Sequence, residues 1–357
     1  MTKKRLRTRD LTVGMIVADD IYSLSGQLIL SKHSILSERL LAKLNFYSIP
    51  TVTVMETEAD TPVEDEKLSA IIKKSEEYKE FQKEFSQVTK QLDGVMGKLV
   101  EGEIKQDDIV DIVSNECELF FRKEEKYSFM DMFHNMREMS DTVLTHSLNV
   151  SIVSVMIGRW LGFSKEEQEL LLVSGLLHDI GKLEIPESIL NKPDKLTTDE
   201  YKLVKEHAFK GFKILKNAGM DDRICEVALN HHERCDGSGY PAKLKEDKIS
   251  KYSKIVAIAD VYDAMTAGRP YRDAICPFDV IRKFEDDGLQ MYDASYIMTF
   301  LSKIASTYNH SAVRLSDGRE GEVIMINKQN LSRPVVRVGE DYIDLSKVKE
   351  VKIDAVI

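Results

Sequence analysis

The sequence predicts a mainly α-helical protein with a small α/β unit at one end and a small β unit at the other. Apolar residues recur at helical spacing through most of the stretch from Met130 to Tyr308. Short apolar segments separated by turn-forming residues lie before residue 57 and again after residue 310, which is typical of strands. With 357 residues, of which 43% are hydrophobic, the chain is long enough for two or three compact domains.

The N-terminal segment predicts a small mixed unit. Strands are expected at Leu11–Val17, Gln27–Leu30 and Thr51–Val54, with a helix near Ser37–Asn45. The following stretch, Thr57–Asp65, is acidic and contains a proline, so we expect a linker there.

A long helix is expected next, with one apolar seam along its length. Its apolar residues alternate in steps of three and four: Tyr78, Phe81, Phe85, Val88, Leu92, Val95 and Leu99. This seam predicts either a homodimer through the 78–99 helix or packing on helices of the same chain, and the pattern does not decide between them. A second helix is expected at about Asp107–Phe121.

The central region predicts helices that carry most of the chain's histidines. Ser164 with Glu167 and Thr197 with Glu200 have the spacing of capping boxes that begin helices. Two more helices are expected at Asp221–Glu233 and Lys251–Ala267.

The C-terminal segment predicts a small β-barrel or sheet. Strand patterns occur at Ala312–Leu315, Gly321–Ile326, Pro334–Val338 and Val348–Ile353, and Ser316-Asp317-Gly318 forms a turn after the first.

Charge and composition exclude some classes of function. The net charge of −10 and pI of about 5.5 argue against a duplex nucleic acid partner, so a polyanionic substrate would need a local basic pocket. The basic start, Met1–Asp10, lacks the apolar region of a signal peptide and is expected to be a solvated tail or first strand. No apolar run approaches the roughly 18 residues of a membrane span, and the four cysteines have no CxxC spacing. We therefore expect a cytoplasmic protein with free thiols.

Histidines and acidic residues cluster in the helical region. Five of the eight histidines lie in one window, and adjacent donors occur as His178-Asp179 and His231-His232. A lone histidine on an apolar helix is more often a core residue than a ligand. His146 and His207 could therefore also be core residues. Asp260 is harder to explain that way, because its helix is apolar on all sides and a buried carboxylate requires a cation or a donor. Imidazole and carboxylate without thiolate favour iron, manganese or zinc.

Two further features gain meaning only from this cluster. Lys182 follows His178 by four residues, so a continuing helix would place its ammonium near an anion held at the metals. Elsewhere it would be a solvated surface lysine. The turn Asp236-Gly237-Ser238-Gly239 is ordinary in composition, and only its attachment to His231-His232 sets it apart.

These motifs resemble the HD-GYP family of cyclic di-GMP phosphodiesterases. The resemblance covers about residues 117–309 and lies in five segments: His178-Asp179-x-x-Lys182, Ile185–Pro193, His231–Pro241, Ile258–Thr266 and Arg269–Arg272. It implies a helical HD-type catalytic domain at 117–309, and the N-terminal unit, 1–57, also resembles an accessory domain found ahead of some HD-GYP domains. The sequence pattern adds a connector at 58–116 and a small β domain at 310–357.

The resemblance also implies roles for individual residues. The metal ligands would be His146, His178, Asp179, His207, His231, His232 and Asp260. Asp179 would bridge two divalent metals, expected to be iron or manganese with zinc as a further option, and Asp179 and Lys182 would be catalytic. Substrate contacts would come from Lys182, Gly239, Tyr240, Pro241, Arg269 and Arg272.

One departure from the family pattern bears on the number of metals. Members with three metals carry a glutamate four residues before the first histidine, and here that position is Thr142. Asp141 lies about 100° further round a helix and is a poor substitute. We therefore expect two metals and hydrolysis of cyclic di-GMP to linear pGpG, with little GMP.

Two other functions remain as alternatives. One is an HD-type hydrolase of another nucleotide, which the Gly-Tyr-Pro turn argues against. The other is an adaptor without turnover that binds cyclic di-GMP, or a diguanylate cyclase through the Gly-Tyr-Pro turn, although such adaptors typically lose ligands and all seven are present.

Overall fold

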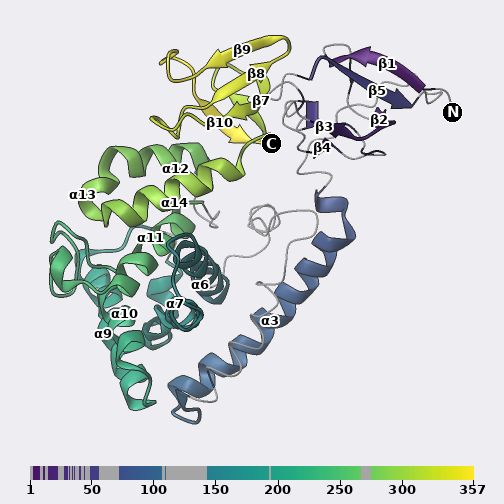
Figure 1. The fold of residues 1–357 in the computed structure, drawn as a ribbon. Coiled ribbons are helices and arrows are strands. Elements are labelled where there is room, and N and C mark those ends of the chain that lie inside the picture. The colour runs from purple at the N-terminus through teal and green to yellow at the C-terminus, as the bar shows by residue number, and fades with distance from the viewer. Residues whose placement is uncertain are drawn as a thin grey trace. The chain divides into compact units, whose positions relative to one another are not determined.

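The computed structural model forms two compact units, Met1–Asp65 and Glu66–Ile357 (Figure 1). It describes residues 3–8, 11, 12, 15–22, 28–30, 32, 34, 36, 40, 41, 44, 49–55, 72–106, 109, 143–192, 194–266 and 275–357. The finer division into connector, catalytic domain and C-terminal domain remains a prediction. The predicted linker at Thr57–Asp65 and nearly all of the predicted helix at Asp107–Phe121 lie outside the described residues.

The first unit contains short antiparallel strands. β1 (Lys3–Arg7), β5 (Thr51–Met55) and β2 (Ile16–Val17) form one sheet in the order β1-β5-β2, while β3 (Ile21–Tyr22) pairs with β4 (Leu28–Leu30). The basic start of the chain is therefore the first strand, one of its two predicted forms. Within the strand predicted at Leu11–Val17, the described residues that pair with β5 are Ile16 and Val17, so the described strand is shorter than predicted.

The apolar seam is buried within its own chain. It lies on α3 (Glu76–Val100), which Ser75 caps by accepting a hydrogen bond from the Tyr78 backbone N–H. α3 contacts α6 (Val143–Trp160) and the 3₁₀ helix η3 (Ile180–Glu184) of the same unit. Every residue of the predicted seam is buried. Packing within the chain, one of the two alternatives for this helix, therefore accounts for the seam.

The helical part surrounds two helices that are buried on nearly all sides. α6 and α11 (Lys251–Thr266) pack on each other and on α7 (Lys165–Leu177). α9 (Thr198–Asn217) and α10 (Asp222–Asn230) complete the layer around the histidines. Both predicted capping boxes are confirmed: Ser164 with Glu167 begins α7, and Thr197 with Glu200 begins α9. Asp221 caps α10, which ends one residue before His231.

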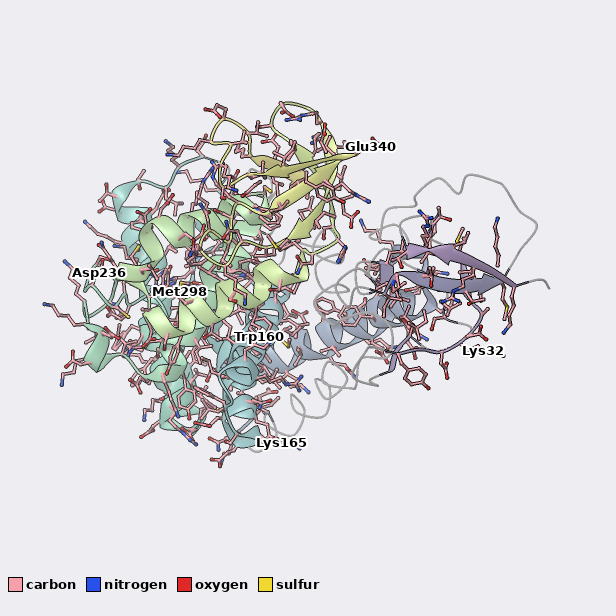
Figure 2. The ribbon with its side chains drawn as sticks, turned by 45° about the horizontal axis from the view of Figure 1, so that its top comes forward. Lys32, Trp160, Lys165, Asp236, Met298 and Glu340 are labelled. Atoms are coloured by element: carbon pink, nitrogen blue, oxygen red, sulfur yellow. The ribbon has the colours of Figure 1, made fainter. Side chains whose placement is uncertain are left out.

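The helices after α11 support the C-terminal sheet. α12 (Pro277–Lys283) runs into a π-helical turn at Phe284–Gly288, followed by α13 (Leu289–Met291) and α14 (Ala294–Thr307). The Glu285 carboxylate in this turn accepts the backbone N–H groups of Leu331 and Ser332 at 2.6 and 3.3 Å. Lys352 bridges to Asp279 on α12 at 3.0 Å. These contacts fix the sheet to the helical part, and Figure 2 shows Met298 on α14 and Glu340 in a turn between two strands of the sheet.

The sheet has five antiparallel strands in the order β10-β6-β7-β8-β9. β6 (Ala312–Leu315), β7 (Glu320–Met325) and β8 (Val335–Val338) match the predicted strands within a residue. The strand predicted at Val348–Ile353 is wrong, because the residues before Ile353 are not in a strand. β10 begins at Ile353 and ends at Val356. β9 (Asp341–Asp344) was not predicted, since this edge strand is short and polar.

No helix in the described part of the chain is long and apolar enough to cross a membrane.

Candidate metal centre

Five helical elements bring the predicted ligands to one point. His146 lies on α6, His178 and Asp179 follow α7, His207 lies on α9, and His231 and His232 follow α10. Asp260 lies on α11. His232 is partly buried and the other six residues are buried. The structure therefore places all seven predicted residues together, although the sequence spreads them over five segments.

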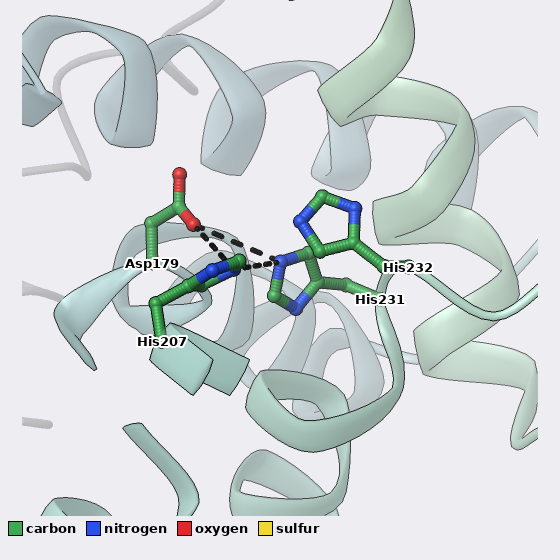
Figure 3. A group of neighbouring side chains, drawn as sticks. All are labelled: Asp179, His207, His231 and His232. Atoms are coloured by element: carbon green, nitrogen blue, oxygen red, sulfur yellow. Dashed lines mark hydrogen bonds and ion pairs between the residues drawn. The ribbon is translucent and has the colours of Figure 1, made fainter. Parts of the chain in front are cut away.

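Asp179 stands between two groups of histidines. Its Oδ1 lies 3.2 Å from His207 Nε2 and 3.7 Å from His231 Nε2. Its Oδ2 lies 3.2 Å from His178 Nε2 and 3.7 Å from His146 Nε2. Donor atoms of two sets converge closely enough for one ion each: Asp179, His207, His231 and His232 (Figure 3), and His146, His178 and Asp179. Asp179 belongs to both sets.

Asp260 lies beside both groups. Its Oδ1 is 3.1 Å from His146 Nε2 and 4.0 Å from His178 Nε2. Its Oδ2 is 3.8 Å from His232 Nδ1. The carboxylate that the sequence placed in an apolar helix therefore faces imidazoles of both groups.

Hydrogen bonds from Nδ1 orient four of the five histidines: His146, His178, His207 and His231. Nδ1–H donates to a main-chain carbonyl in three of them: His178 to Gly175 at 2.7 Å, His207 to Val204 at 2.6 Å and His231 to Ala228 at 3.0 Å. His146 differs, because its Nδ1–H donates to the Asp263 carboxylate at 2.8 Å. In His178, His207 and His231 this leaves the Nε2 lone pair facing the centre, as metal ligation requires, whereas His146 Nε2 lies 3.1 Å from Asp260 Oδ1.

Two buried polar atoms at the centre fit a cation. Among the described residues, neither His178 Nε2 nor Asp179 Oδ1 has a hydrogen-bond partner. An unsatisfied buried polar group costs about 1–3 kcal/mol, and a metal ion would satisfy both atoms. The donor set of imidazole nitrogens and carboxylate oxygens suits iron, manganese or zinc.

The pKa shifts keep most of these donors in the form that binds metal. Burial lowers the pKa of His207, brings that of His232 to about 3 and places that of His231 well below its ordinary value. Burial opposes ionisation of Asp179, but the charges of Lys182 and His178 hold its pKa well below the ordinary value.

His146 is the exception. Burial lowers its pKa, but the hydrogen bonds to Asp260 and Asp263 outweigh burial and raise the pKa to about 9. Without metal, this raised pKa favours the protonated ring between the two carboxylates at neutral pH.

Lys182 lies near the centre because the chain turns after α7 ends, and not because α7 continues. α7 ends at Leu177, and the chain turns into η3, where Gly181 packs against the backbone of α9. The Lys182 ammonium forms an ion pair with Asp179 Oδ2. The structure therefore places Lys182 beside Asp179, and the continuing helix on which the expected position depended is not present.

The turn after the paired histidines packs on one of them. The Glu233 carboxylate accepts the backbone N–H groups of Ala242 and Leu244 at 2.7 and 2.9 Å, which folds the turn back on itself. The Tyr240 ring stacks on His232 with 4.6 Å between centroids. Gly239 passes so close that an added Cβ would lie 2.5 Å from the His232 oxygen. Gly239 and Tyr240 therefore hold the loop against His232, and Pro241 follows a cis peptide bond.

Sequence reasoning missed two of the supporting residues. Asp263 and Glu233 are both buried carboxylates, 1% and 2% exposed. The argument that singled out Asp260 applies equally to Asp263, three residues later in the same apolar helix. Arg269, Arg272, Asp141 and Thr142, which the sequence also singled out, lie outside the described residues.

Comparison with known proteins shows the family of the chain. The HD domain family model matches residues 109–296, and the chain belongs to the HD domain family. A cyclic di-GMP phosphodiesterase of Pseudomonas aeruginosa is 34% identical over 194 residues, which cover 54% of this chain and 47% of the relative.

Two further relatives cover a similar region. A cyclic di-GMP phosphodiesterase of Thermotoga maritima is 35% identical over 197 residues, covering 53% of each protein. The 3′3′-cGAMP-specific phosphodiesterase 1 of Vibrio cholerae is 43% identical over 136 residues, covering 38% of this chain and 32% of the relative. The chain thus spans about half or less of the length of these relatives. The HD-type domain predicted from the motifs is confirmed.

Proposed function

We propose that the protein is a metal-dependent phosphodiesterase that hydrolyses cyclic di-GMP to linear pGpG. The observation that carries the proposal is the position of Asp179, whose two oxygens face separate groups of histidines. The relatives named above, two of them cyclic di-GMP phosphodiesterases, support the choice of substrate.

Seven residues would hold two divalent ions, iron or manganese, with zinc as a further option. Asp179 would be shared, with His207, His231 and His232 on one side and His146 and His178 on the other, and Asp260 beside both. When bound, two divalent metals supply Lewis acidity and a water that ionises near neutral pH.

The protein's own groups position and neutralise the substrate. Three main-chain carbonyls and Asp263 fix four of the five imidazoles, so these rings need no reorientation when charge develops. The Lys182 ammonium, paired with Asp179 in the structure, would turn to the scissile phosphate once metal charge neutralises that carboxylate. Asp179 and Lys182 are the proposed catalytic residues.

The remaining substrate contacts are proposed from the family resemblance. Gly239, Tyr240 and Pro241 would border the dinucleotide on the side of His232, with Lys205 nearby, 5.2 Å from the Tyr240 ring. Arg269 and Arg272 would fork to phosphate or to a guanine edge. A diguanylate cyclase is proposed as a partner at the Gly-Tyr-Pro turn.

The product follows from the metal count. A third ion would need an anionic ligand where the sequence has Thr142, and a hydroxyl binds such ions weakly. We therefore propose that hydrolysis stops mainly at pGpG. Thr142→Glu should raise metal content toward three ions per chain and increase the yield of GMP.

The full chain loaded with manganese or iron should convert cyclic di-GMP to pGpG. Chromatography with product standards measures this conversion. Other cyclic dinucleotides and nucleoside monophosphates form the comparison panel. Tight binding of cyclic di-GMP without turnover would support the adaptor instead, and turnover of monophosphates alone would support another HD-type hydrolase. GMP as the main early product would contradict the two-metal proposal.

A further inference from the structure

A cavity of about 370 Å³ lies against Asp179 on the side of the long helix α3. Met96 of α3, Leu144 of α6 and Leu183 of η3 line it with apolar surface. Leu183 is 53% exposed, so an apolar side chain stands at its rim. The volume is within the range of roughly 300–1,000 Å³ that small-molecule sites occupy. A ligand in this cavity would lie next to the carboxylate shared by the two proposed metals.

The polar groups of the cavity come mainly from one side of α3. Lys90 and Asp93 are separated by one helical turn and both line the cavity, together with Thr89. Among the residues that the structure describes, neither Lys90 nor Asp93 has an ion-pair or hydrogen-bond partner. The cavity thus combines apolar walls with the ammonium of Lys90 as a donor and the carboxylate of Asp93 as an acceptor.

This combination matches the edge of one nucleobase. Guanine presents an acceptor oxygen, O6, beside two neighbouring donors, the N1–H and the 2-amino group. A carboxylate accepts two such donors at once, and an ammonium donates to the adjacent oxygen. Adenine presents an acceptor, N1, where guanine presents N1–H, so a carboxylate facing that edge would repel it.

We propose that this cavity is the subsite for one guanine base of the cyclic dinucleotide. Asp93 accepts from guanine N1–H and the 2-amino group, and Lys90 donates to O6, while the apolar walls cover the faces of the base. This subsite rests on the proposed function and adds its base selectivity. α3 precedes residues 109–296, which the family model matches, so the determinant belongs to a part of the chain outside the family domain.

One guanine subsite has a defined consequence for substrate choice. Cyclic di-GMP and cyclic GMP-AMP each carry a guanine that can enter the cavity, whereas cyclic di-AMP does not. The protein should therefore accept the first two and discriminate against the third. Asp93→Asn should weaken this discrimination, because an amide can donate to adenine N1 as well as accept from a base amino group.

The test compares kcat/KM for the three cyclic dinucleotides in the manganese-loaded full chain. In Asp93→Asn, the ratio of cyclic di-GMP to cyclic di-AMP should fall about tenfold, the usual scale for losing a hydrogen bond to a charged group. Lys90→Ala should raise KM for both guanine substrates and leave metal content unchanged. Glu80→Gln and Lys83→Ala, exposed on the same helix outside the cavity lining, are the matched controls.

The outcomes separate the subsite from the proposed activity. If the unmodified protein hydrolyses none of the three dinucleotides, the proposed function fails and the guanine subsite fails with it. If it hydrolyses cyclic di-GMP while Asp93→Asn keeps the original ratio, the guanine subsite alone is overturned. A fall in the ratio that Glu80→Gln reproduces would also overturn it, because the effect would then not come from the cavity.

Discussion

Replacing Asp263 should weaken metal binding although this residue does not face the centre. Its carboxylate accepts the Nδ1–H of His146 at 2.8 Å and is 1% exposed. The other three oriented histidines depend on main-chain carbonyls, which no substitution removes. Asp263 is therefore the point at which ring orientation depends on a side chain.

The expected loss of metal affinity differs between two variants of Asp263. Asp263→Asn keeps an acceptor for Nδ1–H but removes the charge, and Asp263→Ala removes both. Supporting residues of this kind typically change metal affinity about 10–100-fold, or about 1.4–2.7 kcal/mol. We expect the asparagine variant near the lower end of this range and the alanine variant near the upper end.

Competition with a chelator of known affinity measures this change in the manganese-loaded full chain. Asp293→Asn is a suitable control, since Asp293 pairs with Lys254 at 3.1 Å and caps α14 outside the centre. Wild-type affinity in both Asp263 variants would refute the idea that Asp263 orients His146 for a metal. Equal losses in Asp263→Asn and Asp293→Asn would point to general destabilisation.

Three further predictions concern the lysine, the turn and pH. Lys182→Ala should keep its metals and lose on the order of 2–4 kcal/mol of transition-state stabilisation in kcat/KM, and an unchanged rate would remove it from the mechanism. Gly239→Ala should cost about 1–3 kcal/mol in urea unfolding and lower metal content, because the new Cβ would lie 2.5 Å from Glu233 Cα; wild-type values would show that the turn can shift freely. Below about pH 9, metal uptake by the metal-free protein should strengthen up to tenfold per pH unit, since ligation by His146 displaces a proton from a ring whose pKa is raised to about 9; equal affinity in titrations at about pH 6 and about pH 8 would contradict this. The charged His146 ring also stabilises the metal-free fold. This stabilisation is fully present below the ordinary pKa of histidine and should disappear as pH rises through about 9.

Local signals in the sequence predicted the helix starts and most of the strands. Ser164 and Thr197 begin helices through short-range hydrogen bonds, which depend on residues only three positions away. The polar edge strand β9 carries a weak apolar pattern, and the end of α7 at Leu177 has no local stop signal before His178. Periodicity also could not say which helices cover the seam on α3, because the covering residues are distant in sequence.

The site was predictable where burial and residue type act together. Asp260 stood out because an apolar helix cannot bury a carboxylate without a partner, and the structure gives it His146 at 3.1 Å. The stacking of Tyr240 on His232 and the Lys182–Asp179 pair depend on how helices meet, which one sequence does not specify. Family resemblance named the ligands, but the hydrogen bonds that orient them required the structure.

The metal content of the purified full chain, measured beside Asp179→Ala, tests the shared role of Asp179 most directly. Asp247→Ala, which removes an exposed carboxylate, serves as the control. The unmodified protein and the control should each bind two ions per chain, and Asp179→Ala should lose both or retain at most one weakly, because both groups of histidines depend on that carboxylate. Two tightly bound ions in Asp179→Ala, or three in the unmodified protein, would contradict a two-metal centre built on Asp179.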